Sequence, residues 1–122
     1  MSDFHILGKK GEELAAEFLK KEGYTILEKN WKAGKLEIDI IARKEDEIIF
    51  VEVKTRSDNY LATPESAVNT KKQRSIISAA NRYLKKNGID MESRFDIITL
   101  VKEKDNFIID HIKNAFYHTP YL

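Results

Sequence analysis

Two alternating, β-branched runs joined by a short charged segment constrain the fold more than any other feature. They span residues 36–43 and 48–56, with residues 44–47 between them. This pattern is typical of a β-hairpin. With a two-residue turn at Glu45 and Asp46, the numbers of any two residues that face each other add up to the same value. Asp39 therefore lies opposite Glu52. An odd-length loop or a bulge would break that register.

The two faces of the predicted hairpin differ in chemistry. One face is apolar and should meet a core: Ile38, Ile40, Ala42, Ile49, Val51 and Val53. The other carries charges at one end, with two apolar residues below them: Glu37, Asp39, Glu52, Lys54, Ile41 and Phe50. Directly opposed side chains have Cβ atoms about 4.5–5.5 Å apart, and like charges there are destabilising. We therefore expect Asp39 and Glu52 to share a divalent cation with oxygen ligands, with Lys54 as a nearby positive charge.

The spacing of these charged residues resembles a known nuclease signature. Asp39, followed thirteen residues later by Glu52-Val53-Lys54, resembles the PD-(D/E)xK motif, although Ile38 stands where that motif has proline. Further motifs are Gly8-x-x-Gly11-Glu12, Glu37-Ile38-Asp39, Phe50 to Arg56, Lys72-Gln73, Arg94-Phe95-Asp96 and Asn114-Ala115-Phe116. Together they resemble the YraN-type family of small bacterial proteins over nearly the whole chain. That family in turn resembles the Holliday-junction-resolvase branch of the nuclease superfamily.

The resemblance implies roles for individual residues. Asp39 and Glu52 would bind Mg²⁺ or Mn²⁺, the carbonyl of Val53 would add a ligand, and Lys54 would be the catalytic lysine. Residues 5–22 read as a helix that ends at Gly23, and Glu12 borders its apolar stripe. Resolvase-like nucleases use an acid from this helix, so Glu12 joins the predicted site, directly or through water. The alternative is a first-turn acid stabilised by the helix dipole.

A second predicted helix, starting at residue 64 or 65 and ending at 86, carries the clearest basic surface. No acidic residue occurs from residue 66 to 89, whereas six cations do: Lys71, Lys72, Arg74, Arg82, Lys85 and Lys86. Such a surface suits phosphate groups, and Arg56, Lys71, Lys72, Gln73 and Arg74 are the predicted nucleic-acid contacts. Gln73 lies on the apolar face of this helix, so we expect it to reach the carboxylates. A solvated helical face is the alternative.

Composition bounds the class of protein. At 122 residues the chain fits one domain, residues 1–122. It has no cysteine, which excludes disulfides and is compatible with a cytoplasmic location. We find no apolar run of the roughly 20 residues that cross a membrane. The net charge of +1 gives no general support for nucleic-acid binding, so that case depends on local charge.

The order of elements predicts an α/β fold. A helix, three strands, a helix and two strands would form a mixed central β-sheet flanked by helices, with further strands expected at residues 24–31, 94–101 and 107–112. This matches the restriction-endonuclease-like αβββαβ core that the resemblance implies. A loop is expected over residues 57–64.

Three functions fit these observations. The first is a metal-dependent endonuclease that hydrolyses phosphodiester bonds in DNA, with branched or structured DNA implied by resemblance. The second is a nucleic-acid-binding module that no longer cuts, and the third is a structural or adaptor protein whose charges form a surface network. The sequence leaves open whether a homodimer forms.

Overall fold

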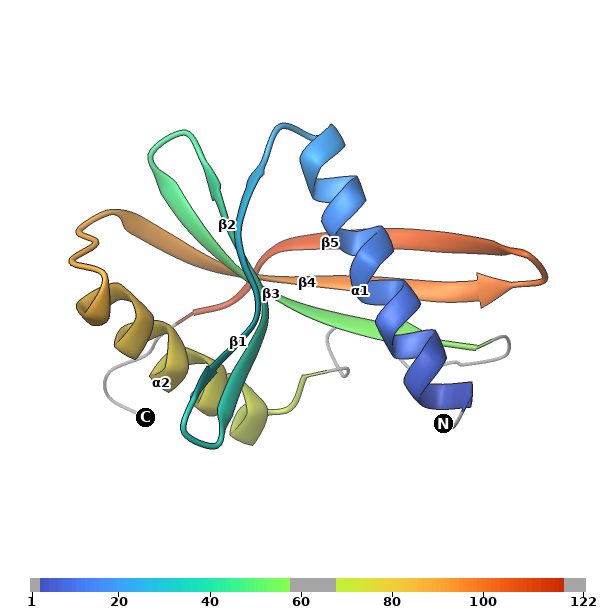
Figure 1. The fold of residues 1–122 in the computed structure, drawn as a ribbon, viewed down its shortest axis with the longest axis horizontal. Helices are drawn as coiled ribbons and strands as arrows, with labels where there is room; N and C mark the ends of the chain where they lie inside the picture. Colours follow the sequence, from blue (N-terminus) through green and yellow to red (C-terminus); the bar gives the residue numbers. More distant parts are fainter. Residues whose placement is uncertain (1–2, 58–67, 118–122) are drawn as a thin grey trace.

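A five-stranded sheet with helices on both faces forms the fold (Figure 1). The computed structural model describes residues 3–57 and 68–117. The elements are α1 (Asp3–Lys21), β1 (Thr25–Ala33), β2 (Leu36–Lys44), β3 (Glu47–Arg56), α2 (Thr70–Lys86), β4 (Glu92–Glu103) and β5 (Asn106–Phe116). The expected α/β class and element order are confirmed. The strands outside the central hairpin end later than the sequence indicated, and the predicted loop lies mostly on residues 58–67, outside the described ranges.

The strands lie in the order in which they occur in the chain, β1-β2-β3-β4-β5. β3 is the central strand, antiparallel to β2 and parallel to β4, and β5 returns antiparallel to β4. In the central hairpin Lys44 pairs with Glu47, and Ile40 pairs with Val51. These pairs have the predicted register, with the turn at Glu45 and Asp46.

The regular alternation of β2 breaks at Asp39. Pairing with β1 stops at Lys29–Ile40 and resumes at Trp31–Ile38, and Asn30 between them has φ 52°. Asparagine is one of the few residues that adopt this left-handed conformation readily. Because of the break, Ile38 belongs to the core under α2, whereas Ile40 faces α1. The prediction that Ile38 shares a face with Ile40 was therefore wrong.

Helix α1 covers one face of the sheet. Its buried residues Ala15, Ala16 and Leu19 pack on Val51 of β3 and on a set of neighbours from β2, β3 and β4: Ile40, Ala42, Ile49, Val53, Ile98 and Leu100. Gly23 follows the helix with φ 93°, as its predicted terminating role requires.

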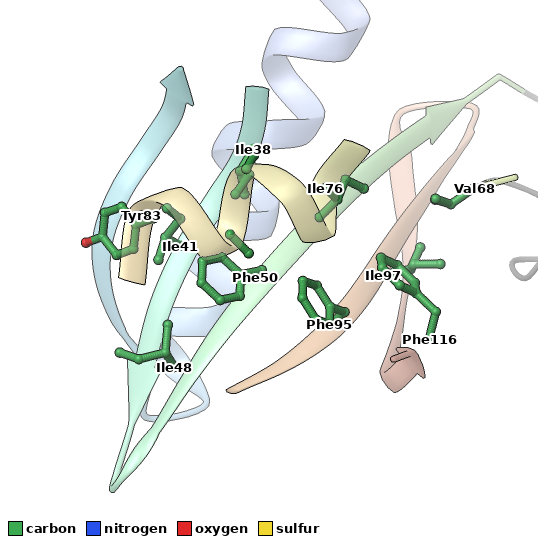
Figure 2. Close-up of a cluster of buried hydrophobic side chains, with 12 residues drawn as sticks. Ile38, Ile41, Ile48, Phe50, Val68, Ile76, Tyr83, Phe95, Ile97 and Phe116 are labelled. Carbon is green, nitrogen blue, oxygen red and sulfur yellow. The ribbon is translucent and has the colours of Figure 1, made fainter. Parts of the chain in front are cut away.

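Helix α2 covers the opposite face, around Phe50 and Tyr83 (Figure 2). The ring of Tyr83 meets Trp31 edge-on with centroids 5.1 Å apart, so Trp31 packs against α2. The helix begins at Thr70 rather than at residue 64 or 65, because Asn69 is extended and its side chain accepts a hydrogen bond from the Lys72 amide.

A buried polar network joins the sheet at the end where β3 begins. Asp96 is fully buried and accepts bonds from the Arg94 guanidinium and the Asn114 amide, and its Oδ2 lies 2.7 Å from Nε2 of His111. Arg94 also donates to Glu47 and to the Tyr24 hydroxyl. Burial alone would raise the pKa of Asp96, but these hydrogen bonds hold it below its usual value. Such a satisfied network fixes the strands at that end.

Within the described ranges, no helix is long and apolar enough to cross a membrane.

Candidate functional site

The candidate site lies where β2 separates from β3. The residue-to-residue pairing of the two strands is regular only as far as Ile40 and Val51. Just beyond it, Oδ2 of Asp39 accepts a hydrogen bond of 2.9 Å from the Val53 amide. The Asp39 carboxylate thus accepts the backbone N–H of β3 that a partner strand would otherwise bind. This hydrogen bond holds Asp39 next to Glu52.

Glu52 is buried without a hydrogen-bond donor for one of its oxygens. Only 4% of the residue is exposed. Its Oε1 lies 3.9 Å from Nζ of Lys54 and 3.8 Å from Nζ of Lys72. Both distances are longer than a hydrogen bond, and the buried Oε2 has no partner among the described residues. A buried carboxylate in this state is costly.

The pKa of Glu52 reflects this environment. Burial raises it most, repulsion by Asp39 adds to the rise, and Lys72 and Lys54 oppose it, giving a pKa of about 8. A hydrogen bond to Asp39, which requires a proton between the two carboxyls, is one of the causes of this raised pKa. At neutral pH Glu52 therefore holds a proton unless a cation replaces it.

Glu12 belongs to α1 and therefore approaches Asp39 from the face of the sheet opposite α2. The preceding residue, Gly11, is so close to β3 that a Cβ there would collide with the Thr55 side chain. This contact holds the start of α1 against the sheet. Burial and repulsion from Asp39 raise the pKa of Glu12, while a hydrogen bond with Asn30 opposes the rise. The role of Glu12 in the site stays a prediction.

The donor set suits a hard divalent cation held by two carboxylates. Among the described residues, no three acidic or histidine side chains gather as a metal-binding group. Mg²⁺ commonly uses one or two carboxylates, with waters and substrate phosphate oxygens as its other ligands. The unpartnered Oε2 of Glu52 beside Asp39 fits such an ion. The carbonyl of Val53 and the carboxylate of Glu12 stay predicted additional ligands.

The predicted nucleic-acid contacts lie at different places. Lys72, in the first turn of α2, reaches Glu52. Gln73 was expected to do so, but its amide nitrogen donates to the Val68 carbonyl at 3.0 Å and so fastens the chain before the helix. Lys71 and Arg74 are exposed. Arg56, at the end of β3, donates to the Thr55 carbonyl.

Two residues near the site were missed by sequence reasoning. Asn30 bonds with Glu12 and lies between the paired residues that flank Asp39. Asn69 caps α2 and thereby places Lys72 near Glu52. A cap signal was present, since Asn69 directly precedes a basic helical segment. Asn30 gave no such signal inside a strand pattern.

Comparison with known proteins identifies the family. The model of the uncharacterised protein family UPF0102 matches residues 11–100. The chain belongs to this family. A UPF0102 protein of Parabacteroides distasonis is 52% identical over 111 residues, covering 91% of this chain and 92% of the relative. Another, from Flavobacterium psychrophilum, is 48% identical over 97% of this chain and 99% of its own.

UPF0102 membership confirms the resemblance to the YraN-type proteins. A third relative, from Bacteroides thetaiotaomicron, is 49% identical and covers 96% of this chain and 97% of its own. The matched residues include Glu12, Asp39, Glu52 and Lys54, so the whole candidate site lies inside the UPF0102 region.

Proposed function

We propose that this protein is a metal-dependent nuclease that hydrolyses phosphodiester bonds in DNA. The observation that carries the proposal is the buried, unpartnered Oε2 of Glu52 beside Asp39, with Lys54 and Lys72 at the other oxygen. A structural ion pair would satisfy its carboxylate with close hydrogen bonds. This site instead keeps one oxygen available and holds two cations 3.8–3.9 Å from the other.

Each residue has a defined task in this proposal. Asp39 and Glu52 would hold Mg²⁺ or Mn²⁺, with the Val53 carbonyl as a further ligand and Glu12 reaching the ion through water. Such an ion supplies Lewis-acid polarisation of the scissile phosphate. Lys54 would orient the attacking water or offset charge that develops on the phosphate oxygens.

The cations around the site would position the DNA backbone. Lys72 is 43% exposed at its side chain, so it can contact a phosphate while remaining near Glu52. Lys71, Gln73, Arg74 and Arg56 would extend this contact. By resemblance to the resolvase-like branch, branched or structured DNA is the proposed substrate class.

A cleavage assay tests the proposal. Linear duplex, single-stranded and four-way-junction DNA would be incubated with Mg²⁺ or Mn²⁺. We expect cleavage of at least one substrate by the wild type. Lys54→Ala should lose roughly 10²–10³-fold in rate, the range for loss of one charge-stabilising group, yet still bind Mn²⁺ and DNA.

Lys21→Ala is the control, because Lys21 is an exposed lysine in the last turn of α1, away from the basic helix α2. It should cleave at the wild-type rate. Undiminished cleavage by Lys54→Ala would disprove the assigned mechanism. If DNA binds without any dependence on metal and is never cut, the protein is a binding module instead.

A further inference from the structure

A cavity of about 680 Å³ opens at the N-terminal end of α1. The described residues that line it are Ile6, Leu7, Lys10, Ser57, Lys102, Asp105 and Phe107. They come from α1, from the segment after β3 and from the far end of the β4–β5 hairpin. Figure 1 shows α1 crossing toward that end of the hairpin. Pockets of about 300–1,000 Å³ are typical of small-molecule sites.

The cavity combines apolar surface with two cations. Ile6 is 54% exposed, although it is a large apolar residue. Phe107 is half-buried, so part of its side chain faces the opening. Lys10 and Lys102 carry positive charge at the wall, and Asp105 is the one acid among the described lining residues. Apolar and aromatic surface suits the face of a nucleobase, and lysines suit a phosphate.

Strand β3 and the residue that follows it connect the candidate site with the cavity. Ser57 lines it and lies three residues after Lys54. At about 3.3 Å per residue, an extended chain places the two about 10 Å apart. Residues three apart on a strand point to opposite faces, so a DNA strand with a phosphate at Lys54 would place a neighbouring nucleotide in the cavity by passing around the end of β3.

We propose that this cavity takes an unpaired nucleotide of the DNA substrate. Its base would lie against Ile6 and Phe107, and its phosphate would meet Lys10 and Lys102. The inference rests on the proposed function and specifies its substrate class as DNA with an unpaired nucleotide near the cleaved bond. Extruding a base from a duplex costs energy, and the cost is least for a base that is already unpaired.

Two exposed isoleucines give a matched pair of variants. Ile6 lines the cavity and is 54% exposed, whereas Ile108 on β5 is 47% exposed and is not among the cavity's lining residues. Ile6→Ser and Ile108→Ser make the same chemical change at similar exposure. Because neither side chain belongs to the core, both variants should fold, and circular dichroism would verify this.

The experiment compares binding of two DNAs of one sequence by fluorescence anisotropy in EDTA, so that no cleavage occurs. One is a perfect duplex, and the other carries a single bulged nucleotide. We expect the wild type to bind the bulged DNA about tenfold more tightly, within the range for stacking one base on an aromatic side chain. Ile6→Ser should reduce this preference, because it removes one of the two apolar side chains that would face the base, and Ile108→Ser should keep it.

Each other result has a defined meaning. Equal affinity of the wild type for both DNAs overturns the cavity assignment, but duplex binding and metal-dependent cleavage would leave the proposed nuclease standing. A preference that is unchanged in Ile6→Ser, or is reduced equally in Ile108→Ser, also overturns it. If neither DNA binds and none is cleaved with Mg²⁺ or Mn²⁺, the proposed function fails together with the cavity.

Discussion

The surroundings of Glu52 do not fit a purely structural ion pair. Glu52 is buried next to a second carboxyl, and Lys54 and Lys72 are too distant for hydrogen bonds. Its pKa of about 8 means that a proton, or a cation in its place, stabilises the folded state. A metal site needs this proton or cation for stability, whereas a surface charge network does not, because water solvates exposed ion pairs.

The stability of the metal-free protein should therefore fall as pH rises. The folded-state pKa of Glu52 is about 8 against an ordinary value of 4.5. Its stabilising contribution is complete below the lower value and is lost as pH rises through the upper one. The slope should approach about 1.4 kcal/mol per pH unit at most. Glu52→Gln cannot ionise, so thermal melts in EDTA should show a flatter pH dependence and equal or higher stability near pH 8.

Addition of Mg²⁺ or Mn²⁺ should make the wild type more stable than Glu52→Gln, which reverses the order of stability in EDTA. A ligand at a hundredfold excess over its dissociation constant stabilises by about 2.7 kcal/mol. The wild type should gain this, whereas Glu52→Gln should gain little. Glu37→Gln is the control, because Glu37 is exposed on the same strand as Asp39. Equal pH slopes for wild type and Glu52→Gln, with no response to either ion, would make Asp39 and Glu52 a structural pair.

At the scale of residues, sequence alone identified the central charges but not all of their partners. Alternation and a short turn were sufficient to place Asp39 near Glu52, because both depend on neighbouring residues in one hairpin. The contacts of Asp96 with His111 and Asn114 join different strands, and no local periodicity encodes them. The same limit applies to Asn30, whose left-handed conformation lies opposite the break in β2.

Among the elements, β2 shows why a face could be predicted incorrectly. Strict alternation would put Ile38 and Ile40 on one face, yet the interruption at Asp39 sends them to opposite cores. The same interruption frees the Asp39 side chain to accept the Val53 amide. A departure from regular strand geometry thus coincides with the candidate site, as expected where function competes with regular structure.

Helix α1 offers a test of how it is held against the sheet. Replacing glycine by alanine inside a helix usually stabilises by up to about 1 kcal/mol. At Gly11 we expect the opposite sign, a loss of about 1–3 kcal/mol, because the new Cβ would collide with Thr55 on β3. Urea unfolding measures the change, and the shifted helix should also weaken metal binding through Glu12.

Gly8→Ala is the matched control in the same helix, since a Cβ at Gly8 meets no atom within 4 Å. It should be neutral or stabilising. If Gly11→Ala is as well tolerated as Gly8→Ala, then α1 does not approach β3 as closely as described. The placement of Glu12 beside Asp39 would then need revision.

For the whole molecule, the distribution of charge matters more than its sum. The net charge is +1, yet α2 has no acid in its first turn and carries basic residues from Lys71 to Lys86. Lys71 and Arg74 are exposed near the helix start, where Lys72 reaches Glu52. A DNA backbone at the candidate site would therefore pass beside them, and it need not touch the balanced remainder of the surface.

The salt dependence of DNA binding measures this directly. For duplex DNA, the slope of log affinity against log salt is about −0.9 per phosphate neutralised. If Lys71 and Arg74 each meet a phosphate, the double variant Lys71→Gln/Arg74→Gln should bind more weakly and flatten the slope by about 0.9 for each lost contact. Lys20→Gln/Lys21→Gln removes the same charge from exposed positions at the end of α1. A slope unchanged in the first variant, or reduced equally in both, would mean that α2 does not form the DNA-binding surface.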